Sequence, residues 1–315
     1  MHVLVTGATG FVGGHLVPEL LAAGHDVRAL VRDPAAYDAP PGVEVVTGDL
    51  LDPASLAGAF DGVDAAFYLV HSMCGGDGYA ERDRRAARNF RTAADGAGVD
   101  RVVYLGGLGD DDDLRSKHLK SRREVEHVLD EGDYDLTTLR AAIVIGTGSA
   151  SFRLVRELTE RLPVMFTPRW VRTECQPIAI DDVLTYLLGV VETPETAGET
   201  YEIGGPEVLT YAEILRRTGR VMHGREPRIV PIPIISPRLS ALAIAATTDV
   251  PSTVARALIH GLKTPVVVRD DRIDDVVPVS PTPFETAVER ALDGTRPDGG
   301  VRERADELVA DGGRR

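Results

Sequence analysis

The sequence predicts an α/β fold, in which a doubly wound parallel sheet carries a small C-terminal α/β lobe over a crevice. Two observations predict it. Short runs of β-branched residues alternate with helical apolar patterns through the first half of the chain, which is typical of βαβ units and a parallel sheet. The first run, Val3-Leu4-Val5, leads directly into a glycine-rich turn. Right-handed crossovers would wind this sheet both ways from its first strand and leave a crevice beside strands one and four.

The turn reads Thr6-Gly7-Ala8-Thr9-Gly10-Phe11-Val12-Gly13, with glycines spaced G-x-x-G-x-x-G. Gly7 would allow a tight turn, Gly10 the approach of backbone to a pyrophosphate, and Gly13 the packing of a helix on the strand. A preceding strand and a following apolar-periodic helix are the context that a dinucleotide-binding Rossmann fold requires. The residues of this turn expected to contact the cofactor are Gly7, Thr9, Gly10, Phe11, Val12 and Gly13.

The remaining elements follow from the same periodicities. The expected strands span residues 2–6, 26–31, 43–47, 64–69, 101–105 and 135–140. The expected helices span residues 11–23, 53–60, 79–97 and 114–131. After residue 146 the rhythm changes: a helix is expected over 149–161, and a later one is opened by Asp181 and Asp182, whose charges suit a helix N-terminus. The chain is therefore expected to divide into an NAD(P)-binding domain (1–148), a smaller substrate or lid lobe interleaved with it (149–295) and a charged tail (296–315).

Residues at the ends of the second and third strands bear on the choice of cofactor. Arg32 ends the second strand, where an acidic residue would bind the adenosine ribose and an arginine can hold a 2′-phosphate. This favours NADP, while NAD remains possible if Arg32 is solvated and Asp33 binds the ribose. Asp49 and Leu50 follow the third strand, where the carboxylate could accept a hydrogen bond from the adenine amine.

These motifs, together with residues 176–183, resemble the extended short-chain dehydrogenase/reductase superfamily. Segments 68–73, 104–108 and 148–152 are similar to its atypical, NmrA-like branch, which includes relatives of the nucleotide-binding accessory subunit of respiratory complex I. The resemblance covers roughly residues 1–290 and concerns the fold and the cofactor site more than the substrate. It implies that Leu69, Val70 and His71, just past the fourth strand, pass the nicotinamide ribose.

The resemblance also implies a catalytic serine after the fifth strand and a Tyr-x-x-x-Lys pair on the next helix, from which the sequence departs. Gly106 and Gly107 stand at the serine region, and His118 and Arg122 replace the tyrosine and lysine at the same spacing. Both would face one way on the helix. Arg122 could hold the nicotinamide ribose, and His118, with a reference pKa near 6.5, could act as acid or base. His118 could instead be only a polar residue at the rim of a nucleotide site.

Several other residues are assigned more ordinary roles. Tyr68 and Tyr104 lie in apolar strands and are expected in the core. Arg140 closes the sixth strand before Ala141-Ala142-Ile143, a segment that resembles the one near the cofactor carboxamide. The run Asp110-Asp111-Asp112-Asp113 lacks the spacing of a calcium loop, and Cys74 sits in a glycine-rich flap without a paired base. No metal site is expected.

Composition limits the partners. Acidic residues outnumber basic ones 49 to 35, giving a formal charge of −14, which argues against nucleic acid or an anionic membrane. The three lysines among many arginines resemble haloarchaeal cytoplasmic proteins, although a GC-rich genome explains the arginine bias equally well. The chain shows no signal peptide, and prolines interrupt its most apolar stretch, residues 229–246, so no transmembrane segment is expected. A cytoplasmic protein with reduced cysteines is the expectation.

Two functions fit these observations. The first is an NADPH-dependent oxidoreductase or isomerase acting on a small apolar molecule, such as a quinone or isoprenoid, held under the second lobe. The second is a non-catalytic NAD(P)H-binding redox sensor, or an accessory or assembly protein peripherally associated with a respiratory complex. The missing Tyr-x-x-x-Lys pair favours the second, and the usual use of the fold favours the first. The residues expected either to line the substrate pocket or to join the lobes are Phe152, Met165, Phe166 and Trp170.

Overall fold

A seven-stranded parallel sheet forms the centre of the larger lobe, as seen in a computed structural model that describes residues 1–71, 78–109, 116–232 and 262–294. The strands run in the order β11-β6-β5-β4-β1-β2-β3. Their bounds are β1 (His2–Thr6), β2 (Asp26–Val31), β3 (Glu44–Thr47), β4 (Ala65–Tyr68), β5 (Arg101–Gly107), β6 (Asp135–Ala141) and β11 (Thr200–Ile203). The six expected strands are confirmed, and the strand order reverses beside β1 and β4, as the doubly wound topology predicts.

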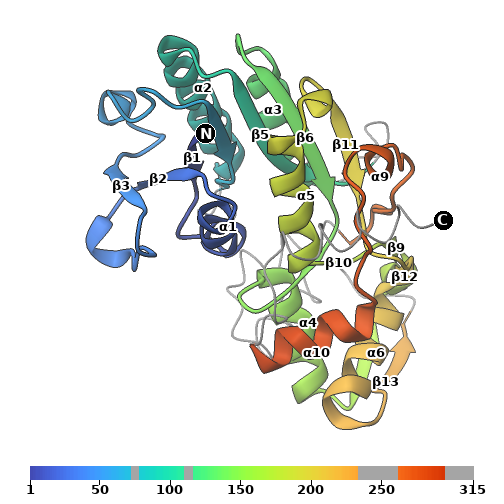
Figure 1. Cartoon of the computed structure of the whole chain (residues 1–315). Helices are drawn as coiled ribbons and strands as arrows, with labels where there is room; N and C mark the ends of the chain where they lie inside the picture. The colour runs from blue at the N-terminus through green and yellow to red at the C-terminus, as the bar shows by residue number, and fades with distance from the viewer. Residues whose placement is uncertain (72–77, 110–115, 233–261, 295–315) are drawn as a thin grey trace, which may run out of the picture.

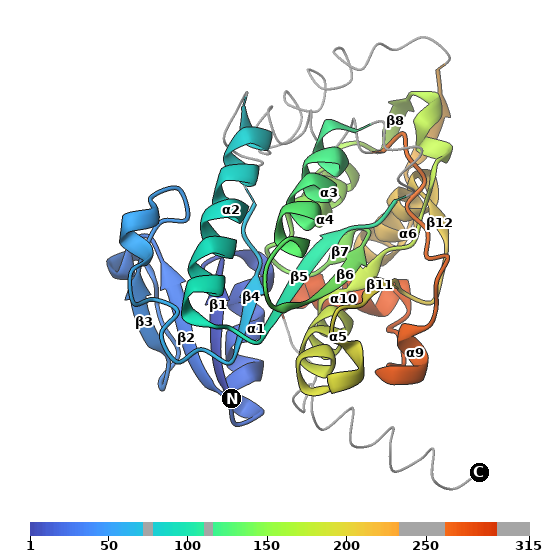
Figure 2. The ribbon, with the colours of Figure 1, turned by 90° about the horizontal axis from the view of Figure 1, so that it is seen from above.

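Helices cover both faces of this sheet (Figures 1 and 2). One layer contains α1 (Phe11–Ala22) and α5 (Ile180–Glu192), and the other contains α2 (Tyr79–Ala97) and α3 (Lys117–Asp130). Each layer shares an apolar core with the sheet, so the central strands are buried on both faces. Val125 and Leu129 of α3 lie in the second of these cores, as the periodicity of that helix predicts.

The expected helix over residues 53–60 is wrong. The chain forms only the 3₁₀ turn η2 (Pro53–Leu56), which the Asp52 carboxylate caps by accepting a hydrogen bond from the Ala54 N–H. Gly58 then adopts a φ of +73°, a left-handed conformation that ends helical structure. The helix expected from residue 114 begins at Lys117, because the Ser116 hydroxyl caps it by accepting from the His118 N–H.

The second lobe lies beyond the carboxyl ends of the strands (Figure 1). Its main helices are α4 (Ala150–Arg161), α6 (Tyr211–His223) and α10 (Phe284–Asp293), with a core of their own. The sequence returns to the sheet between these helices, since α5 packs on α1 and β11 pairs with β6. The second lobe is thus interleaved with the sheet, and residues 295–315 lie outside the described part of the chain.

The remaining elements are short. Three two-stranded sheets pair β7 with β10, β9 with β12 and β8 with β13. Their bounds are β7 (Val144–Ile145), β8 (Val164–Thr167), β9 (Glu174–Cys175), β10 (Ile178–Ala179), β12 (Leu209–Thr210) and β13 (Arg228–Pro231). The other helical turns are η1 (Pro34–Ala36), η5 (Arg169–Arg172), η6 (Pro194–Thr196) and α9 (Ile273–Val276).

Candidate cofactor and active site

The glycine turn between β1 and α1 is closely packed, and the packing explains two of its glycines. Gly7 has a φ of +77°, and a Cβ atom there would lie 2.8 Å from the carbonyl oxygen of Leu69. A Cβ atom at Gly13 would lie 2.3 Å from the carbonyl oxygen of Gly7. The Gly10 N–H donates to that same oxygen at 2.9 Å and closes the turn. Gly7 and Gly13 therefore cannot carry side chains without movement of the backbone.

The N-terminus of α1 is open. Its N-cap residue, Gly10, provides no side chain to accept a hydrogen bond from the first helical N–H groups. Such uncapped N–H groups, together with the helix dipole, attract anionic groups such as phosphates. Thr9 lies exposed in the turn, while Phe11 and Val12 form the first residues of the helix. The residues present therefore fit the pyrophosphate of a dinucleotide.

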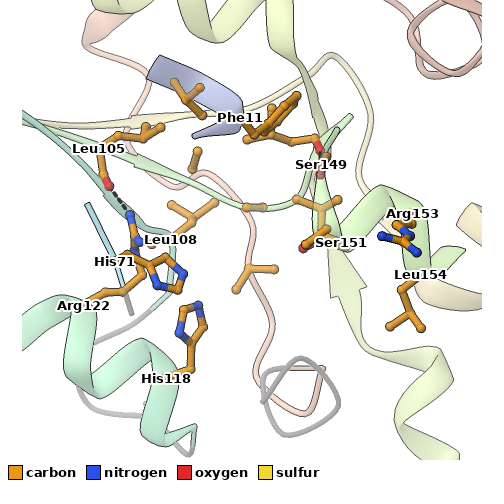
Figure 3. Close-up of a pocket in the computed structure, with 18 of the residues that line it drawn as sticks. Phe11, His71, Leu105, Leu108, His118, Arg122, Ser149, Ser151, Arg153 and Leu154 are labelled. Atoms are coloured by element: carbon orange, nitrogen blue, oxygen red, sulfur yellow. Dashed lines mark hydrogen bonds between the residues drawn. The ribbon is translucent and has the colours of Figure 1, made fainter. Parts of the chain in front are cut away.

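A cavity of about 710 Å³ opens from this turn toward the second lobe (Figure 3). The turn and α1 contribute Gly7, Gly10, Phe11, Val12 and Gly13 to its wall. Leu69 and His71 contribute from the segment after β4, and the ends of β5 and β6 contribute further residues. The opposite wall comes from α4 and α6. The cavity therefore joins the expected cofactor residues to the second lobe.

Three of the predicted site residues meet on one side of this cavity, where His71 and His118 lie close to Arg122 (Figure 3). The ring centroids of His71 and His118 are 5.2 Å apart, with the ring planes tilted by 42°. Arg122 is held in place because its Nη2 donates to the Leu105 carbonyl oxygen, and its guanidinium carbon lies 5.6 Å from the centroid of the Tyr104 ring. The site thus combines a fixed cation with two imidazoles.

The surroundings of His118 in the cavity shift its pKa below the reference value near 6.5, on which the expected acid/base role rests. Burial lowers the pKa of His118 to about 3, and the positive charge of Arg122 acts in the same direction. Burial also lowers the pKa of His71 well below its usual value, with further contributions from Arg122 and His118. Both imidazoles are therefore expected to be neutral near pH 7.

Gly107, at the end of β5, lies close to the side chains of Leu119 and Arg122. A Cβ atom at Gly107 would lie 3.0 Å from Cδ2 of Leu119 and 3.4 Å from Cδ of Arg122. A larger residue at this position would therefore press on the side chains that α3 projects into the cavity. The absence of a side chain at Gly107 leaves room for the side chain of Arg122. In typical short-chain dehydrogenases a serine and a lysine are expected at these places.

The residues expected to bind the adenosine half lie outside the cavity, after the carboxyl ends of β2 and β3. Arg32 is exposed, and within the described chain it makes no hydrogen bond or ion pair. The Asp33 carboxylate caps η1 by accepting from the Ala35 N–H at 3.0 Å. One oxygen of Asp49 accepts from the Leu51 N–H at 2.9 Å, and Leu50 is buried in the core. The roles of Arg32, Asp49 and Leu50 stay predictions, as does that of Val70, which packs against the same core.

Other sequence assignments have clear outcomes. Tyr68 and Tyr104 are core residues, as expected, and burial raises the pKa of Tyr104 to about 12. Arg140 forms an ion pair with Glu126 at 2.5 Å. Cys175 is buried. The segments that contain Cys74 and residues 110–113 lie outside the described residues.

The pocket-lining role expected for three bulky residues is wrong. Phe152 and Met165 are buried in the core of the second lobe, and Phe166 is 63% exposed on β8. The side chain of Trp170 lies outside the described part of the structure. The residues that sequence reasoning missed instead are Ser149, Ser151, Leu154, Val155, Leu158, Tyr211 and Leu215. Their i, i+3 and i+4 spacing on α4 and α6 was the available signal.

The described part of the chain contains neither a helix that could span a membrane nor a cluster of metal ligands. None of the helices in residues 1–71, 78–109, 116–232 and 262–294 combines the length and apolarity needed to cross a bilayer. The same residues contain no group of three or more histidine, cysteine or acidic side chains that could hold a metal ion.

Comparison with known proteins agrees with this site. Residues 7–160 match the sequence model of the NAD(P)H-binding family. The chain is 30% identical over 250 residues to (4-alkanoyl-5-oxo-2,5-dihydrofuran-3-yl)methyl phosphate reductase of Streptomyces griseus, covering 76% of this chain and 80% of that one. It is 29% identical over 281 residues to ceramide reductase of Caulobacter vibrioides, covering 84% and 86% of the two chains. The NADPH complex of an NADPH-dependent quinone oxidoreductase of Escherichia coli superposes with a TM-score of 0.75 at 20% identity, covering 92% and 99%.

The fold and the cavity thus define a Rossmann-type NAD(P)-binding protein. The chain belongs to the NAD(P)H-binding family. It is an NAD(P)H-binding, reductase-like protein, and the cofactor expected from the glycine turn is confirmed at that level.

Proposed function

We propose that the protein is an NADPH-dependent reductase of a small, apolar carbonyl compound. The observation that carries this proposal is that His71, His118 and Arg122 line the same cavity as the glycine turn of the cofactor site. Polar groups fixed beside a cofactor site in an otherwise apolar cavity are typical of an active site. The names of the relatives support the reaction class, since both sequence relatives are reductases and the structural one is a quinone oxidoreductase.

NADPH would supply a hydride for the reduction when it is bound. The turn from Gly7 to Gly13 and the open N-terminus of α1 would hold its pyrophosphate. Arg32 supports NADPH over NADH, because it is exposed and unpaired within the described chain, while Asp33 is engaged in capping. A guanidinium in that position can bind a 2′-phosphate through charge-assisted hydrogen bonds.

Arg122 and His118 would stabilise the charge that develops on the substrate oxygen. As a carbonyl carbon is reduced, its oxygen becomes negative, and fixed donors in a water-poor site stabilise that charge strongly. The guanidinium of Arg122 supplies a positive charge beside that oxygen. Neutral His118 would donate a hydrogen bond to the same oxygen, and the proton that completes the alcohol would come from solvent. This arrangement replaces the tyrosine and lysine of typical family members.

The test is NADPH oxidation by the purified protein across a panel of aliphatic aldehydes, ketones, enones and quinones. At least one class should be reduced, and kcat should fall about a hundredfold in both His118→Gln and Arg122→Gln. His127→Gln is the matched control, because His127 lies exposed on the same helix. Equal activity in all of these variants would remove His118 and Arg122 from the reaction.

A second candidate function is the non-catalytic one, a cytoplasmic redox sensor or respiratory accessory protein. The observation that favours it is the absence of the Tyr-x-x-x-Lys pair, whose helix positions are His118 and Arg122. Tight NADPH binding without oxidation by any compound in the panel would favour this role. The acidic excess of the chain supports a salt-rich cytoplasm as its setting, and a rise in unfolding free energy with added KCl would test that.

A further inference from the structure

The cavity has two chemically different ends. One end holds the polar groups His71, His118 and Arg122. The other end passes between α4 and α6, with Leu154 on the side opposite to His71 and His118 (Figure 3). We call this second end the apolar arm and define it by Leu154, Val155, Leu158, Tyr211, Leu215 and Val266, all of which line the cavity.

Three polar side chains beside the arm, those of Ser149, Arg153 and Tyr211, already have partners. The Ser149 hydroxyl donates to the Val144 carbonyl oxygen at 2.7 Å and accepts from the Phe152 N–H at 3.3 Å. The Tyr211 hydroxyl is hydrogen-bonded to the Cys175 thiol. Arg153 is exposed, and its Nε donates to Glu157 at 2.7 Å. A ligand in the arm would therefore be held by apolar contact, because these polar groups are already paired.

The apolar arm is lined by one stripe of residues on each of two helices. Along α4 the lining residues recur at Ser151, Leu154 and Leu158, which places them on one stripe of the helix. At 1.5 Å per residue, the stripe from Ser151 to Leu158 extends for about 10 Å. Tyr211 and Leu215 form a matching stripe on α6, which packs directly against α4. The apolar wall of the arm therefore runs as a strip along two helices that pack on each other.

Building on the proposed function, we infer that the substrate carries a linear hydrocarbon chain on its carbonyl group and that this chain lies in the apolar arm. The carbonyl would then meet Arg122 and His118 at the polar end of the same cavity. A linear chain can extend along the apolar stripe of α4 and contact Leu154 and Leu158 in turn, which a compact fused ring system of the same carbon number does less well. Burial of each methylene should tighten binding by about fourfold until the arm is full.

The experiment measures binding of methyl n-alkyl ketones, from butanone to hexadecanone, to the NADP⁺-loaded protein. The dissociation constant should fall by about fourfold per added methylene and then reach a plateau when the chain exceeds the arm. Leu154→Trp and Leu158→Trp should both shorten the chain length at which the plateau begins. Leu154→Trp should shorten it more, because Leu154 lies one turn nearer to the polar end.

Val208→Trp is the matched control, since Val208 is 46% exposed and lies outside the cavity wall. It should keep the wild-type plateau. Binding that is independent of chain length, or tighter binding of a fused-ring ketone with the same number of carbons, would overturn the inference. The wild-type series tests the arm even where a tryptophan variant does not fold.

The same series separates this inference from the proposed function. A chain-length plateau in binding without reduction of any ketone would refute the reductase and leave the arm standing. Reduction of every ketone with the same kcat/KM would refute the arm and leave the reductase standing.

Discussion

His71 and His118 lie next to each other on one side of the cofactor cavity with their ring centroids 5.2 Å apart, although one follows a strand and the other opens a helix. Arg122 lines the cavity beside them, and its positive charge adds to the effect of burial in lowering the pKa of both histidines. The two imidazoles are therefore held neutral. This pair gives the site a pH behaviour unlike that of a free histidine.

We predict that the free energy of unfolding decreases as the pH falls below about 6.5, the ordinary pKa of histidine. The pKa of His118 is about 3 in the folded protein, so in this window the unfolded chain binds a proton that the folded chain does not. His118→Gln should reduce the pH slope of stability by up to about 1.4 kcal/mol per pH unit. Urea unfolding at about pH 6 and about pH 5 measures it.

Two controls accompany this prediction. His127→Gln should keep the wild-type slope, because His127 is exposed on the same helix. Under the proposed function, the titration of His118 should not appear in the pH profile of kcat/KM near pH 6.5. The profiles of the wild type and of His118→Gln should therefore have the same shape in this range. A decline in activity with an apparent pKa of about 6.5, lost in that variant, would mean that His118 titrates normally in the working enzyme.

We predict that Gly107→Ser, which introduces the residue type found in typical family members, lowers kcat by about tenfold or more instead of raising it. The new Cβ would press on Leu119 and Arg122, whose side chains are flexible enough to move without unfolding the protein. The displaced guanidinium would then no longer be fixed at the Leu105 carbonyl. Steady-state kinetics and circular dichroism would separate loss of activity from loss of fold.

Gly96→Ser is the control for this substitution. Gly96 lies in α2, and a Cβ atom there would meet no atom within 4 Å. The variant should have wild-type kcat. Wild-type or higher activity of Gly107→Ser would show that Arg122 does not need its present position.

Local periodicity correctly predicted most strands of the sheet. It also predicted α2, whose expected bounds match the observed ones. It missed β11, because this four-residue strand is specified by its pairing with β6 rather than by its own composition. It also overestimated the helix at residues 53–60, where Gly58 ends the turn. Tertiary context decides such short elements.

The candidate site was predictable to a similar extent. The glycine turn could be placed from its position between a strand and a helix, whereas His71, His118 and Arg122 were placed by the resemblance to the extended short-chain dehydrogenase/reductase superfamily. The apolar arm could not, because Leu154 and Leu215 meet only when α4 packs on α6. The low pKa of His118 could not be predicted either, since it depends on burial that no local pattern specifies.

We predict that Gly13→Ala weakens NADPH binding by tenfold or more and destabilises the protein by about 1–3 kcal/mol. Its Cβ would lie 2.3 Å from a backbone oxygen of the turn, so the backbone itself must move. Gly14→Ala is the neighbouring control, because its nearest contact would be an ordinary 3.5 Å. That variant should bind NADPH normally and be up to about 1 kcal/mol more stable, owing to the helix propensity of alanine. Equal NADPH affinity in both variants, measured by calorimetry, would contradict the assigned role of Gly13.

We predict that Arg32→Asp shifts the binding preference from NADPH toward NADH. Arg32 is exposed at the end of β2 and is not committed to another group in the described chain, so it is available to a 2′-phosphate. Loss of a charge-assisted hydrogen bond should weaken NADPH binding by about ten- to a hundredfold. The new carboxylate can accept hydrogen bonds from the ribose hydroxyls of NADH.

The control must carry the same change in net charge, because Arg32→Asp also makes an acidic protein more repulsive to any dinucleotide. Arg225→Asp serves this purpose, since Arg225 is exposed in the turn that follows α6, in the second lobe. It should weaken NADPH and NADH binding to the same small extent. Titration of both cofactors against the three proteins gives the ratio of dissociation constants. An unchanged ratio in Arg32→Asp would mean that Arg32 does not contact the 2′-phosphate and that selectivity arises elsewhere around the adenosine.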